Sequence, residues 1–196
     1  MAIFLIAILI FSSFYNITFQ KHISTDTYVI ESWIKPKQLD NILQIINKNH
    51  NNKQINLFMI GRSMGDRFHI PHNKIIKQYQ NINFRHFVTE PNGQNRTFRI
   101  LNLMKNDLRK DNINLDNFII YTSNIHSKRF YFIAKKIFKN SNIGIKWYIE
   151  NNNSNIISNK NWYKSSENFK KVIMESISLY YSYIKYLSLF SNSNFK

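Results

Sequence analysis

The sequence predicts an α/β fold: an open three-layer α/β/α sandwich with a mostly parallel five-stranded sheet, in one domain at residues 26–190. Short apolar runs rich in isoleucine and aromatic residues alternate with longer segments whose apolar residues recur every three or four positions. Such alternation is typical of βαβ units, which build a parallel sheet covered by helices. With 196 residues and 43% hydrophobic content, the chain can bury one core but not two.

Residues 1–20 precede this domain and are expected to form an N-terminal hydrophobic helix. The run from Ala2 to Phe19 has no charged residue and is close to the minimum length for crossing a bilayer. We favour an uncleaved transmembrane anchor over a signal peptide, since no positively charged region precedes the run and no pair of small residues marks a cleavage site. A buried core helix is the third interpretation. Lysines follow the run and none precedes it, which favours a cytoplasmic body, but lysine is frequent along the whole chain, so the side stays open.

The first half of the domain contains three expected strands. Apolar runs end at loops that contain Trp33 and Pro36 after the first strand and the turn Gly61–Gly65 after the second. The expected elements are, in order, a strand at 27–31, a helix with apolar positions 39, 42, 45 and 46, a strand at 55–60, a short helix within 69–80 that starts after Pro71, and a strand at 83–89.

The second half begins after the break at Asn92-Gly93 and completes a Rossmann-like order of elements. An asparagine-rich loop at 151–160 separates the last strand from the last helix. The expected elements are an amphipathic helix through 97–108, a strand from Phe118 to Thr122, a helix to about 138, a strand at 143–149, and a long helix from about 165. That last helix carries an apolar stripe expected to face the core, at Phe169, Val172, Ile173, Ile177, Tyr180, Ile184 and Leu187.

The segment between Phe118 and Phe130 is the strongest candidate for function. The strand stops at Thr122, Ser123 and Asn124, and His126 and Arg129 then share one face of a helical first turn. Open α/β folds place ligands where a strand delivers polar residues to a helix N-terminus. Free backbone N–H groups, the helix dipole and an arginine would favour an anion such as phosphate. The segment therefore predicts a phosphate-type binding site.

The residues of this segment keep more than one interpretation. His126 is either a general acid/base or phosphate ligand, since its ordinary pKa lies near neutrality, or a polar residue that fixes the turn. Arg129 either clamps an anion or pairs with Glu175 or Glu150. Thr122 and Ser123 are expected as helix caps rather than nucleophiles, and no Gly-x-Ser-x-Gly elbow suggests a serine hydrolase.

Further candidates come at the ends of the other expected strands. Glu31 could be an acid/base, a ribose contact or half of a salt bridge. Glycines after the second strand could offer backbone N–H groups to a phosphate, although their spacing matches neither a Walker loop nor a dinucleotide fingerprint. The additional ligand-binding candidates are Gly61, Arg62, Ser63, Glu90 and Thr97.

Composition excludes several classes of function. The chain has no cysteine, so disulfides, thiolate catalysis and cysteine-bound metals are excluded. No metal site is expected, since His69 and His72 have no evident third ligand. The net charge of +16 is spread over a chain crowded with Asn, Lys and Ile, so we attribute it to compositional bias and expect no nucleic-acid partner. The residues point to no particular cofactor.

Five stretches occur in an order that resembles the YdcF/SanA/ElyC-like family, over residues 27–186. They are VIESWIKPKQLDNIL, FMIGRSMG, EPNGQNRTFRIL, YTSNIHSKRFYFIAKKIF and NWYKSSENFKKVIMESISLYY. Two departures stand near the presumed site: Ser32 replaces the usual glycine of the first loop, and Arg62 replaces the second glycine after the second strand.

The resemblance implies a single-pass protein of the inner membrane that acts in envelope biogenesis, with its domain outside the cytoplasm. The implied ligand is a phosphorylated or anionic molecule such as a lipid-linked sugar phosphate. In an enzyme, Arg129 and the helix N-terminus would hold the phosphate while His126 or Glu31 moved protons. The alternatives are a non-catalytic envelope interaction factor, and a protein that binds S-adenosylmethionine.

Overall fold

The sheet of this protein consists of five parallel strands in the order β3-β2-β1-β4-β5. The computed structural model describes residues 17–51, 53–62, 66–89, 96–113, 115–148, 157 and 162–191, without the side chains of 62, 66–70 and 186–191. The strands are β1 (Thr27–Glu31), β2 (Ile55–Arg62), β3 (Ile82–Thr89), β4 (Asn117–Thr122) and β5 (Asn142–Trp147). Every pairing among them is parallel, so the predicted α/β class is confirmed and the sheet is all-parallel.

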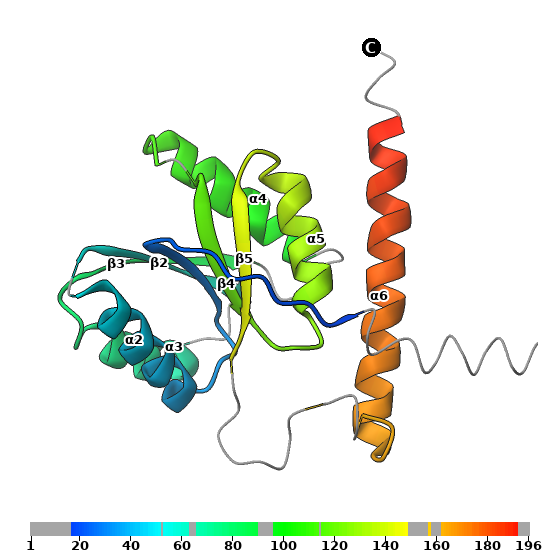
Figure 1. Ribbon diagram of the computed structural model, residues 1–196, viewed down its shortest axis with the longest axis horizontal. Helices are drawn as coiled ribbons and strands as arrows, with labels where there is room; N and C mark the ends of the chain where they lie inside the picture. Colours follow the sequence, from blue (N-terminus) through cyan, green and yellow to red (C-terminus); the bar gives the residue numbers. More distant parts are fainter. Residues whose placement is uncertain are drawn as a thin grey trace, which may run out of the picture.

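Five helices complete the described part of the chain. Their bounds are α2 (Pro36–His50), α3 (Asp66–Ile76), α4 (Arg96–Lys110), α5 (Ser127–Ile137) and α6 (Ser166–Ser191). In Figure 1, α2 and α3 cover one face of the sheet, α4 and α5 cover the other, and the long α6 stands beside α5. The arrangement is consistent with a Rossmann-like sandwich.

The strand order places a topological switch between β1 and β4. From β1 the chain builds outward through β2 to β3, then returns to the other side of β1 for β4 and β5. Ile30 of β1 lies opposite Tyr121 of β4, so the next residues, Glu31 and Thr122, emerge side by side at the carboxyl edge. Open α/β sheets bind ligands in the crevice at such a switch.

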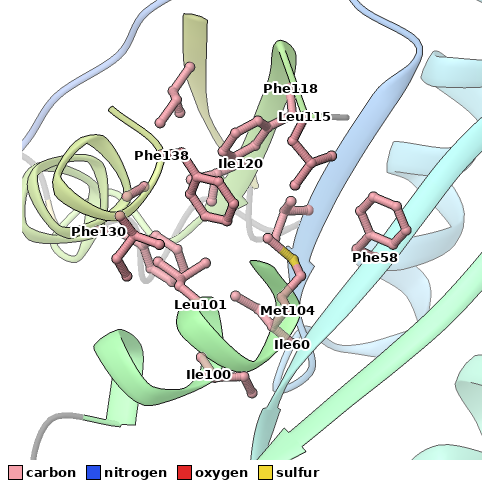
Figure 2. Packing of buried hydrophobic residues seen from close by; sticks show 14 of the residues in the cluster. Phe58, Ile60, Ile100, Leu101, Met104, Leu115, Phe118, Ile120, Phe130 and Phe138 are labelled. Carbon is pink, nitrogen blue, oxygen red and sulfur yellow. The ribbon is translucent and has the colours of Figure 1, made fainter. Parts of the chain in front are cut away.

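Burial on both faces explains why the strand sequences are continuous apolar runs. In β1, Tyr28 and Ile30 pack with α2 and α3, whereas Val29 packs with α4 and α5. The core on the α4 and α5 side is shown in Figure 2, where Phe58, Leu101 and Phe130 from three different elements lie around one apolar centre.

Two of the expected boundaries that differ from the structure lie in the first half of the domain. Helix α3 begins at Asp66 and continues through Pro71, although the proline was expected to precede the helix. A proline there removes one backbone donor, and burial of Ile76 together with a 2.7 Å hydrogen bond from His72 Nε2 to the Ile34 carbonyl favours the helix. Gly61 and Arg62, expected in a turn, are the last residues of β2 because they pair with Val88 and Thr89 of β3.

The expected core face of the last helix is right for Val172, which is buried, and wrong for most of the stripe; the side chain of Leu187 lies outside the described residues. The stripe residues Ile177, Tyr180 and Ile184 are exposed, at 57%, 48% and 70%. Helix α6 instead buries a narrower and partly polar face, whose members are Val172, Glu175, Ser176, Leu179 and Ser182. The inward face was missed because a buried ion pair, absent from any apolar pattern, orients the helix.

The segment before β1 runs along the open edge of the sheet. Lys21 forms an antiparallel bridge with Ile145 of β5, and Trp147 Nε1 donates to the Phe19 carbonyl at 2.9 Å. These contacts cover the edge strand, which would otherwise present unpaired backbone groups. Within the described residues, no helix is long and apolar enough to cross a bilayer. Most of the anchor expected at 1–20 lies outside those residues.

Close packing between Gly61 and Ser32 gives a first prediction. A Cβ at position 61 would lie 1.6 Å from Ser32 Oγ and 2.7 Å from Ser32 Cβ. We expect Gly61→Ala to lower the free energy of unfolding by about 1–3 kcal/mol through overpacking. Urea unfolding of the full chain measures this change.

The matched control is Ser32→Gly, which removes both atoms that the new methyl group would meet. In that background Gly61→Ala should cost much less. An equal loss with and without Ser32→Gly would contradict the proposed clash.

Candidate functional site

A cavity of about 780 Å³ opens at the carboxyl edge of the sheet. Its walls come from the ends of β1, β2 and β3, the N-terminal turns of α4 and α5, and the middle of α6. The candidates that the sequence predicted and the structure places around this cavity are Glu31, Gly61, Thr97, His126 and Arg129. Residues from six separate helices and strands therefore meet at this edge.

The floor of the site is a hydrogen bond between the ends of the two central strands. Thr122 Oγ1 donates to Glu31 Oε2 at 2.5 Å, and both side chains are buried. Burial raises the pKa of Glu31 to about 7, against the lowering effects of the charge on His126, the hydrogen bond from Thr122 and the charge on Arg129. Glu31 can therefore gain or lose a proton near neutral pH.

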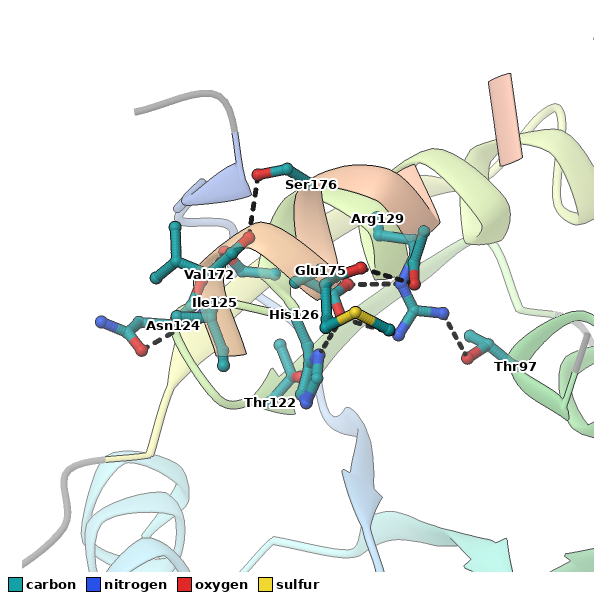
Figure 3. A network of polar contacts seen from close by, with 12 residues as sticks. Thr97, Thr122, Asn124, Ile125, His126, Arg129, Val172, Glu175 and Ser176 are labelled. Atoms are coloured by element: carbon teal, nitrogen blue, oxygen red, sulfur yellow. Dashed lines mark hydrogen bonds and ion pairs between the residues drawn. The ribbon is translucent and has the colours of Figure 1, made fainter. Parts of the chain in front are cut away.

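A buried carboxylate from α6 organises the side chains above this floor. Glu175 accepts hydrogen bonds from Arg129 Nε and Nη2 on one side and lies 2.7 Å from His126 Nδ1 on the other. Arg129 Nη1 also donates to Thr97 Oγ1 at 3.3 Å, which links α5 to α4. Figure 3 shows this network, with Glu175 between the imidazole and the guanidinium. The predicted pairing of Arg129 with Glu175 is thus present.

The ionisation of the network follows from these contacts. Burial opposes protonation of His126, but the hydrogen bond and charge of Glu175, with the charge of Glu31, raise the pKa of His126 above its ordinary value. Burial likewise opposes ionisation of Glu175, but His126 and Arg129 outweigh it and lower the pKa of Glu175. The charged forms of Glu175, His126 and Arg129 therefore stabilise one another.

The predicted caps of α5 do not cap it. Thr122 donates to Glu31 instead, and among the described residues Ser123 Oγ has no hydrogen-bond partner. The helix starts after His126, whose side chain caps no described backbone group. Asn124 turns its amide toward the Ile157 carbonyl, beside a second cavity. The Thr122 hydroxyl is not available to the helix end because it donates to the carboxyl group of Glu31 on the neighbouring strand.

The N-terminus of α5 also offers fewer free donors than expected. The backbone N–H groups of Ile125, His126 and Ser127 donate to Asn124 Oδ1, the Ser123 carbonyl and the Asn124 carbonyl. Binding of an anion at this site would therefore depend on side-chain donors more than on these three backbone N–H groups.

The side chains of three predicted residues are not among those that the structure describes. Ser63 and Glu90 lie outside the described residues, and Arg62 is described only in its backbone, at the end of β2. Of the two histidines considered for metal, His72 is buried and bonded to a carbonyl. Within the described part of the chain, no group of three His, Asp or Glu side chains is placed to hold a metal ion.

Several cavity residues were not among the candidates. Trp33 follows β1, and Arg96 is the first residue of α4, next to the predicted Thr97. The rule that polar residues gather where elements begin beyond the sheet edge could have found Arg96. The wall supplied by α6 could not have been found that way, since it comes from the middle of a helix; its members are Ile177, Ser178, Tyr181 and Ser182.

Comparison of the chain with family models, with curated proteins and with solved structures finds no match in any of the three. The function is therefore argued from the cavity itself.

The raised pKa of Glu31 predicts a pH dependence of stability. Between its ordinary value of 4.5 and about 7, the folded chain holds a proton on Glu31 that the unfolded chain has released. The free energy of unfolding therefore falls as pH rises through this window. Glu31→Gln lacks this titration, so its stability relative to the unsubstituted chain should rise by about 3 kcal/mol from pH 4 to pH 8. Urea unfolding at both pH values measures the difference, and a pH-independent difference would contradict the assignment.

The central position of Glu175 predicts the behaviour of His126. Glu175→Gln removes the charge that raises the pKa of His126, while burial and Arg129 continue to lower it. We expect the pKa of the His126 imidazole to fall, as followed by NMR titration of its ring protons.

Glu167→Gln is a matched control on the same helix, because Glu167 is exposed and pairs with Lys171. That variant should leave the His126 titration unchanged. An equal shift in both variants would show that long-range charge, and not the direct contact, sets the pKa.

Proposed function

We propose that this protein binds a phosphorylated or otherwise anionic ligand in the cavity at the β1–β4 switch. The observation that carries the proposal is the joint presence there of Arg96, Arg129 and His126 with Glu31, a carboxyl group whose pKa lies near neutrality. Guanidinium groups bind phosphate and carboxylate oxygens through paired, charge-assisted hydrogen bonds.

The charge balance of the site favours an anion. Below about pH 7, Glu31 is mostly protonated and neutral. Glu175 is then the ionised carboxylate that faces His126 and Arg129, and Arg96 adds a further positive charge to the lining. Cationic groups thus exceed anionic ones, and an incoming phosphate would restore the balance.

The same contacts suggest how an enzyme would use these groups. Glu175 fixes the plane of the Arg129 guanidinium, which still has second N–H groups on Nη1 and Nη2 for a ligand. Because His126 Nδ1 faces Glu175, Nε2 is the nitrogen that remains for proton transfer. His126 would act as general acid or base, and Glu31 is the second candidate for that role.

The biological setting is proposed from the resemblance of the five motifs to the YdcF/SanA/ElyC-like family. In that setting the uncharged run at 2–19 anchors the protein in the membrane, the domain lies outside the cytoplasm, and the ligand is a lipid-linked sugar phosphate of envelope biogenesis. The apolar side chains of Ile177 and Tyr181 in the cavity wall suit a ligand with a hydrophobic part.

A non-catalytic envelope factor is the second candidate. The observation that favours it is Ser32, which stands where the family usually has glycine and whose hydroxyl occupies the space directly beside Gly61. A narrowed floor of this kind could bind a ligand without giving it access to Glu31.

Arg96 provides the test of ligand binding. We expect polyprenyl phosphate, but not S-adenosylmethionine, to raise the melting temperature of the detergent-solubilised full chain. Arg96→Gln should weaken binding of polyprenyl phosphate about tenfold through loss of one charge-assisted contact. Sugar nucleotides, tested in parallel, separate recognition of the sugar from recognition of the lipid.

The matched control is Arg99→Gln, since Arg99 is exposed on the same helix and does not line the cavity. It should bind like the unsubstituted chain. Equal weakening by both variants would reduce the proposal to general charge attraction, and no stabilisation by any phosphorylated probe would overturn it. If polyprenyl phosphate stabilises the chain but is not converted to any product, the non-catalytic factor is favoured.

A further inference from the structure

The outward face of α6 carries an apolar stripe without a covering element among the described residues. The helix has 26 residues, which is about 39 Å of length. Glu175 on its buried side contacts Arg129 of α5, and the helical repeat of 3.6 residues per turn puts most of its large exposed side chains on the other side. Those exposed side chains are Met174, Ile177, Tyr180, Tyr181 and Ile184, whereas Phe169 stacks on the ring of Trp162.

We propose that this stripe lies on the surface of a lipid bilayer. A helix with one apolar face, tyrosines and flanking lysines is suited to the boundary between headgroups and acyl chains. Tyr180 and Tyr181 combine an apolar ring with a polar tip, as side chains at membrane interfaces do. Lys170 and Lys185 of the same helix can meet anionic lipid headgroups.

The path of the chain brings the membrane to this helix. Ile17 is buried in a small cluster with Trp162, Val172 and Leu179, so the described chain begins beside α6, directly after the uncharged run. If those residues enter a bilayer, its surface lies within a few residues of α6. The contact thus rests on the proposed anchor and not on the identity of the ligand.

Two other occupants fit less well. A second copy of this chain would bring together two proteins that each carry a net charge of +16, which opposes association. Residues 1–16 fit less well as the cover, because the residue that they join, Ile17, packs with Val172 and Leu179 on the buried side of α6.

The contact would set the position of the candidate site. Ile177 and Tyr181 belong both to the stripe and to the cavity wall. A bilayer against α6 therefore places the cavity mouth at the lipid surface, from which an amphiphilic ligand could enter without crossing water.

The absence of cysteine allows a direct test with single labelled sites. Ile184→Cys carries a fluorophore on the stripe, and Lys48→Cys carries it on exposed α2 as the matched control. Each full-length variant is reconstituted into vesicles of phosphatidylcholine and phosphatidylglycerol that contain doxyl-labelled lipid. We expect doxyl lipid to quench the fluorophore at position 184 at least threefold more strongly than the one at position 48. Aqueous iodide should quench the fluorophore at position 184 more weakly than the one at position 48.

Every other pattern overturns the contact. Equal quenching at both sites, or failure of the chain to associate with vesicles, leaves the stripe in water. Shielding of 184 from iodide without doxyl quenching shows that protein covers it. In that case the unlabelled Ile184→Cys variant is tested for a disulfide between two chains. A disulfide identifies a second copy as the cover, and no disulfide leaves residues 1–16 as the cover. Binding of polyprenyl phosphate in detergent is measured separately, so the two proposals can fail independently.

Discussion

One buried carboxylate, Glu175, joins the parts of this structure that form the candidate site. It holds the imidazole of His126 and the guanidinium of Arg129, and it brings α6 against α5. Removal of one partner from a buried ion pair commonly costs about 3–5 kcal/mol, because the remaining charge stays desolvated. The orientation of α6 is therefore tied to the same contact that positions the two side chains proposed to bind and protonate a ligand. Burial of Val172 and Leu179 on the same face of the helix reinforces it.

The parallel sheet supplies the second constraint. Its switch between β1 and β4 puts Glu31 and Thr122 side by side at the carboxyl edge, where their hydrogen bond closes the floor of the cavity. Burial keeps Glu31 protonated to near neutral pH, while the cations above it keep Glu175 ionised. Two carboxyl groups of one cluster thus hold different charges, as acid and base groups of many active sites do.

Elements with a strong local signal could be predicted from the sequence. The strand at Thr27–Glu31 was predicted with its exact bounds. A strand of a parallel sheet is buried on both faces, so its apolar run and the polar residues around it mark where it begins and ends. Grouping of Glu31, Thr97, His126 and Arg129 was also within reach, because residues after parallel strands meet at one edge. Prediction from local sequence was wrong where a distant group competes for the same side chain. Thr122 was expected to cap a helix, but its hydroxyl donates a hydrogen bond to the carboxyl group of Glu31, ninety-one residues away.

The sequence by itself determined the parallel α/β class, the order of its elements and the edge of the sheet where polar residues collect, since these depend on periodicity and on chain direction. Only the tertiary structure decided which face of α6 turns inward. By apolar pattern the stripe with Ile177 and Ile184 should be buried, yet Glu175 faces inward and that stripe faces out. The physical reason is that Glu175 in the interior needs Arg129 and His126 as partners, because a desolvated charge without a partner is costly, and Val172 and Leu179 are buried on the same face. A partner forty-six residues away in the chain cannot be read from local periodicity.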